Sequence, residues 1–148
     1  MSSAKSTGMP ALKLVNQYVK SLLFTSKIMP TEAIFESTKD ADVSTDINID
    51  AVHFKENSYE VSLSIRCVAS VKDHEICEID VVYAGVFEVV DIDSDDLEMV
   101  LLIYCPGVIY PFAREVVANS VMRAGLPPLM LELVDFSQIY YDSIEEDN

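Results

Sequence analysis

Apolar and polar residues alternate strictly along residues 59–67 of the chain. Every odd-numbered position there is apolar or aromatic, and every even-numbered position is polar. This period of two is typical of a β-strand that is buried on one face only. Residues 43–51 alternate in a similar way, residues 12–24 alternate less regularly, and residues 76–90 are rich in Val and Ile. The pattern therefore predicts four strands.

Turn signals separate these predicted strands. Polar residues at Asn57-Ser58 and at 72–75 mark two hairpin turns, and the polar, irregular stretch 27–42 contains Pro30. Prolines and runs of polar residues interrupt strands, whereas short turns join neighbouring antiparallel strands. Clean alternation with hairpin spacing indicates an antiparallel sheet that has one solvent-exposed face.

The second half of the chain is predicted to be helical. Residues 97–104 are apolar except for Glu98, and Cys105-Pro106-Gly107 is expected to end this first helix. A second helix is expected from Pro111 to Gly125, and Asp135 is expected to cap a short third one. The fold class is therefore α+β, with a four-stranded antiparallel sheet packed on two main helices plus a short C-terminal helix.

An apolar helix without a polar side has to be covered all round. One sheet covers only one side of the helix 97–104, so we expect another subunit to cover the other side. The alternative is a helix that is sandwiched inside a single chain. In an oligomer, the expected interface residues are Leu97, Val100, Leu101 and Tyr104.

Composition narrows the range of partners. The 148 residues carry a formal charge of −15 with ten Lys and Arg side chains, although half of the residues are apolar. So acidic a chain suits a basic partner better than nucleic acid or an anionic membrane. Alternatively, the acidity only keeps an apolar chain soluble. Neither a signal-peptide core nor an uninterrupted apolar run of bilayer length is found, so no membrane insertion is expected.

Candidate catalytic and metal-binding chemistry is sparse. The three cysteines are an odd number without a C-x-x-C pair, which favours reduced thiols in a cytoplasm. His53 and His74 have no metal-ligand spacing with these cysteines. The acidic run 91–96 has Asp96 and Leu102 where a calcium loop needs Gly and Glu. The sequence therefore predicts a protein that is not an enzyme and needs no metal or cofactor.

Residues 104–115, with the sequence YCPGVIYPFARE, resemble the signature of the SecB family of bacterial protein-export chaperones. Residues 126–136 are similar to the stretch after that family's long helix, and residues 17–20, 59–61 and 84–87 resemble parts of its strands. A composite match is more specific than one short motif. The resemblance covers residues 11–141, which would form one chaperone domain between a flexible N-terminus (1–10) and an acidic C-terminal tail (142–148).

The resemblance implies a cytoplasmic homotetramer, a dimer of dimers, that binds unfolded secretory preproteins in apolar grooves without ATP. It also implies delivery to the translocase motor SecA, whose basic zinc-binding tail docks on the acidic, exposed face of the sheet. Candidate groove residues, for each of which plain core packing is the alternative, are Phe35, Ile47, Ile49, Tyr110, Leu129 and Leu131.

The expected motor-binding face departs from the family pattern. Ser21 and Thr25 stand where the family usually has acidic residues on its first strand, whereas Asp80, with Glu78 beside it, meets the acidic position of the fourth strand. We therefore expect the motor contact to be weakened, or shifted toward Asp46, Asp50 and Glu60.

Two other functions remain open at this stage. The altered face suits a SecB-like chaperone that is dedicated to a single partner, such as an antitoxin. A small-molecule-binding enzyme on an α+β scaffold is a third hypothesis, and only Cys105 and the acidic run 91–96 support it.

Overall fold

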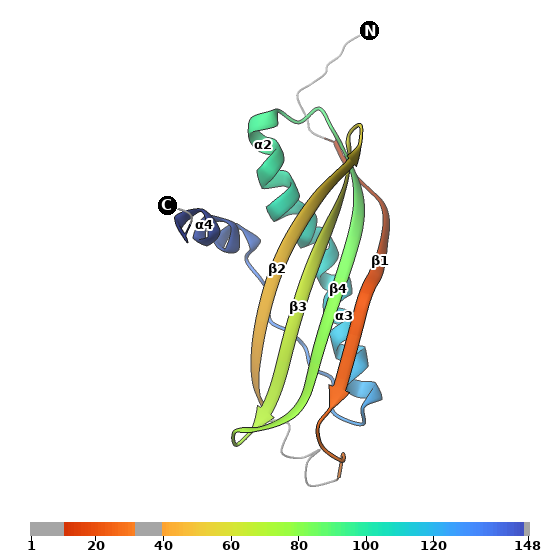
Figure 1. Ribbon diagram of the computed structural model, residues 1–148, viewed down its shortest axis with the longest axis vertical. Helices are drawn as coiled ribbons and strands as arrows, with labels where there is room; N and C mark the ends of the chain where they lie inside the picture. Colours follow the sequence, from red (N-terminus) through yellow and green to blue (C-terminus); the bar gives the residue numbers. More distant parts are fainter. Residues whose placement is uncertain (1–10, 32–39, 147–148) are drawn as a thin grey trace.

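The computed structural model describes residues 11–31 and 40–146. An antiparallel sheet comes first along the chain and helices follow, as the sequence predicts (Figure 1). The strands are β1 (Ala11–Ser26), β2 (Asp42–Lys55), β3 (Ser58–Val71) and β4 (His74–Val90). The helical segments are α2 (Ser94–Met99), η2 (Val100–Tyr104), α3 (Cys105–Arg123) and α4 (Phe136–Glu146).

The strands lie in the order β1-β4-β3-β2, so β1 and β2 are the two edges of the sheet. Tight turns at residues 56–57 and 72–73 connect β2 to β3 and β3 to β4. Lys72 and Asp73 both have positive φ values, 50° and 67°, which match the right-handed twist of the strands that they join. The two predicted hairpins are confirmed.

The irregular pattern of β1 has a structural cause. Its register with β4 shifts between Leu14 and Asn16, and again between Val19 and Ser21. Each bulge adds one residue, so the parity of the positions that face the core changes at each shift. The residues of β1 that lie opposite the buried odd-numbered positions of β4 are consequently Leu12, Leu14, Gln17, Val19, Leu22, Phe24 and Ser26.

The helical half departs from the prediction at one place. α2, η2 and α3 follow one another without a gap, so residues 94–123 form one continuous helix. The expectation that Cys105-Pro106-Gly107 ends a helix is therefore wrong. Pro106 lacks an N–H, and its ring crowds the preceding turn. η2 is a wider, π-helical turn in which the Cys105 N–H donates to the Val100 carbonyl, and such a turn accommodates the proline.

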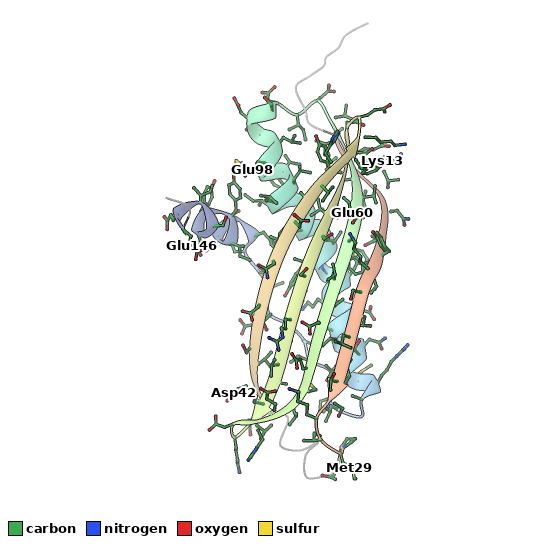
Figure 2. All side chains as sticks on the ribbon, viewed as in Figure 1. Lys13, Met29, Asp42, Glu60, Glu98 and Glu146 are labelled. Atoms are coloured by element: carbon green, nitrogen blue, oxygen red, sulfur yellow. The ribbon has the colours of Figure 1, made fainter. Side chains whose placement is uncertain are left out.

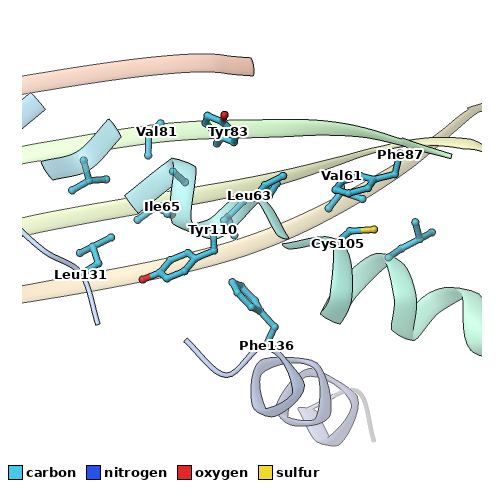
Figure 3. Close-up of a cluster of buried hydrophobic side chains, with 14 of the residues drawn as sticks. Val61, Leu63, Ile65, Val81, Tyr83, Phe87, Cys105, Tyr110, Leu131 and Phe136 are labelled. Atoms are coloured by element: carbon cyan, nitrogen blue, oxygen red, sulfur yellow. The ribbon is translucent and has the colours of Figure 1, made fainter. Parts of the chain in front are cut away.

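This continuous helix packs along one face of the sheet and leaves the other face open (Figure 1). Inward side chains of β3 and β4, such as Leu63 and Phe87, form the core with Ile109 of α3, and all three are fully buried. Figure 3 shows part of this cluster. At Gly85 an added Cβ would lie 2.8 Å from Phe87 Cε2 and 3.0 Å from Ile109 Cγ2. Glycine at this position therefore lets the helix approach the sheet closely.

The chain after the long helix turns toward β2. Gly125, with a φ of 83°, follows α3 in the left-handed conformation that favours glycine. The Asp135 carboxylate accepts a 3.0 Å hydrogen bond from the Ser137 N–H and caps α4, as predicted. Phe136 packs edge-on against Tyr110 at a centroid distance of 5.6 Å (Figure 3). Residues 142–146, which the sequence analysis assigns to the tail, are part of α4.

The continuous helix also bears on membrane insertion. By length and composition, residues 94–123 could cross a bilayer, because their most apolar stretch has a mean hydropathy of 1.5. That stretch is 44% buried inside the chain, and the core helix of a soluble protein passes the same test. Length and composition alone are therefore weak evidence for a membrane span.

Candidate functional site

The width of the helix decides which parts of the sheet stay open. A helix with its side chains is about 10 Å wide, and neighbouring strands lie about 4.8 Å apart. One helix therefore covers about two strands, and here it covers the two central ones, β3 and β4. The inward side chains of the edge strand β2 stay half-buried or exposed.

A groove of about 560 Å³ lies between β2 and the extended segment that follows α3. Four of the six predicted groove residues line it, namely Ile47, Tyr110, Leu129 and Leu131. Tyr110 and Leu131 are only 5% and 4% exposed and form its floor, whereas Ile47 and Leu129 are half-buried. Phe35, the first candidate, lies outside the described residues.

Tyr110 holds one wall of this groove in place. Its hydroxyl donates a 2.5 Å hydrogen bond to the Glu132 carbonyl. Burial raises the pKa of Tyr110, so the hydroxyl stays protonated and remains a donor at neutral pH. The segment 129–134 is thereby tied to the long helix, and β2 forms the opposite wall.

A second hollow, of about 460 Å³, opens farther along β2 between this strand and the start of the long helix. Ile49 lines it together with Leu97 and Leu101. Ile47 and Ile49 are consecutive inward positions of the same strand, so the two hollows adjoin each other. Together they accompany residues 43–51 of β2, a length of about 26 Å at 3.3 Å per residue.

The structure adds groove residues that the sequence analysis does not name. Leu133 and Met130 line the first hollow and are 85% and 58% exposed, which makes them its most open apolar side chains. Their signal in the sequence is the short apolar run 129–134, which has neither the helical nor the strand period. An apolar segment without a partner of its own is the feature that points to them.

The strand register puts the five carboxylates predicted to face a partner on the outer side of the sheet, away from the helix. Figure 2 labels one of them, Glu60. They are Asp46 and Asp50 of β2, Glu60 of β3, and Glu78 and Asp80 of β4. The register places Arg66 of β3 opposite both Asp46 and Asp80. A cation therefore lies between two carboxylates in one row across the sheet.

Glu78 and Asp80 are ion-paired within the chain. Arg66 Nε donates a 2.9 Å hydrogen bond to Glu78 Oε1 and lies 3.7 Å from Asp80 Oδ1. Lys27 Nζ lies 3.3 Å from the other Glu78 oxygen. The hydrogen bonds from Arg66 and then from Lys27 hold the pKa of Glu78 below its ordinary value.

Glu60 is ion-paired in a similar way, by donors that reach across β4 from the edge strand β1. Lys20 Nζ and the Tyr18 hydroxyl donate hydrogen bonds of 2.5 and 2.6 Å to its two oxygens. These bonds lower the pKa of Glu60. Asp46 and Asp50 form no hydrogen bond or ion pair with any residue that the structure describes. The unpaired negative charge of the five therefore lies on β2.

Ser21 and Thr25 lie on this outer side too. They stand opposite Val82 and Glu78, and Leu23 lies between them opposite Asp80. Leu23 is 62% exposed. The outer side of β1 therefore has no acidic residue from Ser21 to Thr25, as the sequence predicts from the two positions.

The four residues expected at a subunit interface have different surroundings. Val100 and Leu101 are 8% and 7% exposed and belong to the core of the chain itself, and Leu97 packs against the same core. Tyr104 is 62% exposed. Of the four side chains, Tyr104 is the one that is open to solvent.

Among the described residues, neither Cys105 nor the His, Cys, Asp and Glu side chains form a clear catalytic or metal-binding site. Cys105 is fully buried, and burial raises its pKa to about 12, so the thiol stays protonated and is a poor nucleophile. Among residues 11–31 and 40–146, no group of three or more His, Cys, Asp and Glu side chains is placed to hold a metal ion.

Comparisons with known proteins agree with this geometry. A family model, "SecB: Preprotein translocase subunit SecB", matches residues 5–147. Protein-export protein SecB of Rickettsia typhi is 35% identical over 147 residues, which cover 99% of this chain and 96% of the relative. The Rickettsia felis protein of the same name is 36% identical over 139 residues, 93% of this chain and 91% of the relative.

A solved structure shares the fold. It is a SecB-like chaperone of Mycobacterium tuberculosis in complex with a peptide of the HigA1 antitoxin, with a TM-score of 0.70 at 16% identity over 83% of this chain and 90% of that chain. The family match extends over nearly the whole sequence. The chain therefore belongs to the SecB family, soluble bacterial chaperones that bind client polypeptides and act in protein export.

Proposed function

We propose that this protein holds unfolded preproteins in the groove along β2, without ATP, and delivers them to the translocase motor SecA. The observation that carries the proposal is the pair of adjoining hollows lined by Ile47, Tyr110, Leu131, Ile49 and Leu101. Apolar burial is non-directional and contributes about 25 cal/mol per Å². A groove of this kind accepts many apolar segments and rejects folded proteins, which expose few of them.

The edge of β2 adds a second, sequence-independent contact. Because β2 is the last strand of the sheet, one side of its backbone carries N–H and C=O groups that no neighbouring strand occupies. An extended client can hydrogen-bond to such an edge. Client side chains would enter the hollows while the client backbone lies along the strand. Neither contact requires nucleotide hydrolysis.

Delivery to the motor would use the outer face of the sheet. The basic tail that the family resemblance implies needs free carboxylates, and Asp46 and Asp50 are unpaired in the described part of the chain. Asp80 becomes available only when Arg66 releases it, and Glu78 only when both Arg66 and Lys27 release it. We therefore place the first contact of the tail on β2 and its later contacts on β4.

Assembly into a tetramer would cover apolar surface that one chain leaves open. On the edge strand β1, Val15, Val19 and Leu22 are 50%, 42% and 46% exposed. An exposed, apolar edge strand is a template for pairing with another chain. The dimer of dimers implied by the family resemblance would pair or cover such edges.

A holding assay tests the groove. The protein should suppress aggregation of a refolding preprotein at one tetramer per client without nucleotide. Met130→Glu with Leu133→Glu should weaken client binding at least about tenfold, because charge replaces apolar contact. Met29→Glu is the matched control, since Met29 is 79% exposed and lines neither hollow. Absence of suppression by the unaltered protein would contradict the proposal.

Titration with the isolated basic tail of the motor tests delivery separately. Asp46→Lys and Asp80→Lys should each weaken binding at least about tenfold. Asp73→Lys, in an exposed hairpin turn, makes the same charge change elsewhere and should have little effect. If the unaltered protein holds several unrelated clients but does not bind the tail, holding stands and delivery to the motor is wrong.

A further inference from the structure

Lys27 connects the outer side of the sheet with the chain that leads to the groove along β2. It directly follows β1, and its Nζ lies 3.3 Å from Glu78 Oε2 and forms a second ion pair with Glu75. Its N–H donates a 2.9 Å hydrogen bond to the Ile76 carbonyl. Both the side chain and the backbone of Lys27 therefore hold the chain after β1 against the first residues of β4.

The next residues along the chain pack against the start of the segment that forms the groove wall 129–134. Ile28 packs on a small apolar cluster that contains Leu126, which is 3% exposed. Pro30 Cγ lies 3.2 Å from the position that a Cβ of Gly125 would take. Gly125 and Leu126 lie between α3 and the wall. The chain after β1 therefore supports the place where the wall begins.

A small cavity of about 60 Å³ shows that this cluster and the groove share residues. Its lining contains Leu126 together with Ala41 and Leu129, and Ala41 and Leu129 also line the groove. Both of them pack against the same cluster as Ile28. Because protein interiors are closely packed, a displaced side chain is felt by its neighbours. A shift of Ile28 therefore reaches the groove through direct contacts.

Two cations of the chain share Glu78, and a basic partner on the outer side of the sheet competes with both. Arg66 hydrogen-bonds to one Glu78 oxygen and contacts Asp80, so its ion pairs stay within the outer side. Lys27 occupies the other oxygen and is the cation that continues into the groove support. A cation of the partner at Glu78 takes this acceptor from Lys27 and places a like charge beside its ammonium.

We propose that Lys27 couples the docking of a basic partner on the outer side of the sheet to client binding in the groove. With Lys27 on Glu78, the chain after β1 is fixed and the groove wall is held in its client-binding form. With a basic partner on Glu78, Lys27 is released and the wall loosens. This inference rests on the proposed holding and delivery of clients and adds how the second step acts on the first.

The direction of the coupling follows from the cost of ordering the wall. A loosened wall has to be ordered again when a client binds, and this lowers the affinity for the client. By thermodynamic linkage, a bound client weakens docking of the basic partner by the same factor. Exposed ion pairs are weak, so the coupling should be about threefold and not a complete release of the client.

Client affinity with and without the isolated basic tail of the motor tests the inference. The client is an unfolded segment free of Lys and Arg, so that the tail does not repel it directly. In the unaltered protein, saturating tail should raise the Kd for this segment about threefold. Lys27→Ala should already bind the client about threefold more weakly, and saturating tail should change that Kd by less than about 1.5-fold.

Two matched variants separate Lys27 from charge in general. Arg66→Ala removes the other cation on Glu78 but leaves the groove support in place, so saturating tail should still raise the Kd for the client. Lys72→Ala, in an exposed turn, removes a positive charge elsewhere and should couple like the unaltered protein. Amide hydrogen exchange at Leu129 and Leu131 should be faster in Lys27→Ala than in either control, because it reports local opening of the wall.

Each outcome bears on one proposal. Equal coupling in Lys27→Ala and in the unaltered protein overturns the inference, and so does coupling that is lost in Arg66→Ala as well. Unchanged amide exchange in Lys27→Ala contradicts the loosening of the wall. If the unaltered protein binds client and tail without mutual effect, only this inference is wrong. If it fails to bind one of them, the proposed holding or delivery is wrong instead.

Discussion

The two faces of the sheet share one backbone and differ in burial, packing and charge. On β3, Val61, Leu63 and Ile65 face the helix and are at most 1% exposed. Their neighbours in sequence face solvent, and the charged ones among them, Glu60 and Arg66, are held in ion pairs. The inner face is organised by close packing, which is sensitive to volume. The outer face is organised by charge, which a partner can rearrange. We therefore expect stability to depend on the inner face and partner choice on the outer one.

The largest expected difference between the faces is in stability. Leu63→Ala should lower the free energy of unfolding by about 2–5 kcal/mol, because a fully buried side chain leaves a cavity. Ser64→Ala, at the next position on the outer face, should change it by less than about 0.5 kcal/mol. Urea unfolding at a fixed protomer concentration measures both. Similar losses for the two variants would remove the contrast.

Overpacking should also affect the inner face. Gly85→Ala places a Cβ 2.8 Å from Phe87 Cε2 and 3.0 Å from Ile109 Cγ2, so either the helix or the ring must move. We expect a loss of about 1–3 kcal/mol in the same unfolding experiment. Ser62→Ala on the outer face is the comparison and should be close to neutral. A stable Gly85→Ala variant would show that the helix is packed less closely.

The alkylation rates of the three cysteines should show how well the inner face excludes solvent. Cys67, Cys77 and Cys105 are at most 2% exposed, and burial raises the pKa of each. Because each pKa is raised in the folded protein, the buried protonated thiols favour folding fully at a pH below the ordinary value of 9.0. For Cys105, stability is lost as the pH rises from that value toward its pKa of about 12. At neutral pH, alkylation should be at least about tenfold slower in the folded protein than in urea. One thiol reacting at the unfolded rate would contradict this.

The smallest expected effect on stability is at Arg66 on the outer face. Its side chain is 54% exposed, and solvent screens exposed ion pairs, so Arg66→Ala should leave the free energy of unfolding nearly unchanged at neutral pH. The pKa of Glu78 is lowered mainly by Arg66. The stabilisation is therefore present above the ordinary value of 4.5 and is lost as the pH falls through the lowered pKa.

Acid titration of stability from about pH 6 to about pH 3 measures this contribution, which should be smaller in Arg66→Ala. The same variant frees Asp80 and leaves Glu78 with Lys27 alone, so it should bind the basic motor tail more tightly than the unaltered protein. Lys72→Ala, in an exposed turn, is the matched control. Weaker tail binding by Arg66→Ala would show that Arg66 does not compete with the partner.

Strand prediction succeeded where the pattern depends only on neighbouring residues. The period of two in β3 survives because each of its odd positions meets the same helix. In β1 the two bulges change the parity of the inward positions, so apolar and polar residues do not alternate regularly along the whole strand. The helix break predicted at Cys105-Pro106-Gly107 is wrong for a related reason. Local propensity predicts a break there, but Cys105 and Pro106 are buried against the sheet, and packing keeps the helix intact.

The candidate sites show the same division. Apolar groove residues and outward carboxylates could be predicted, because residue type and the alternation of strand positions follow directly from the sequence. The sequence could not show which of these carboxylates form ion pairs within the described part of the chain. Lys20 and Glu60, for example, are 40 residues apart and meet only across β4. The same is true of the exposed Leu133, whose position depends on the hydrogen bond of Tyr110 to the neighbouring Glu132 carbonyl.

By itself, the sequence determined the four strands, the acidic exterior, the family and five of the residues that line the two hollows, since each follows from local pattern, residue type or motif. Only the tertiary structure decided that the helix is continuous and that β2 is left half-covered. It also decided that Arg66 pairs with Glu78, while Asp46 and Asp50 have no partner among the described residues. These features depend on how wide a helix is relative to a sheet and on which side chains meet across strands. Neither property belongs to any short stretch of chain.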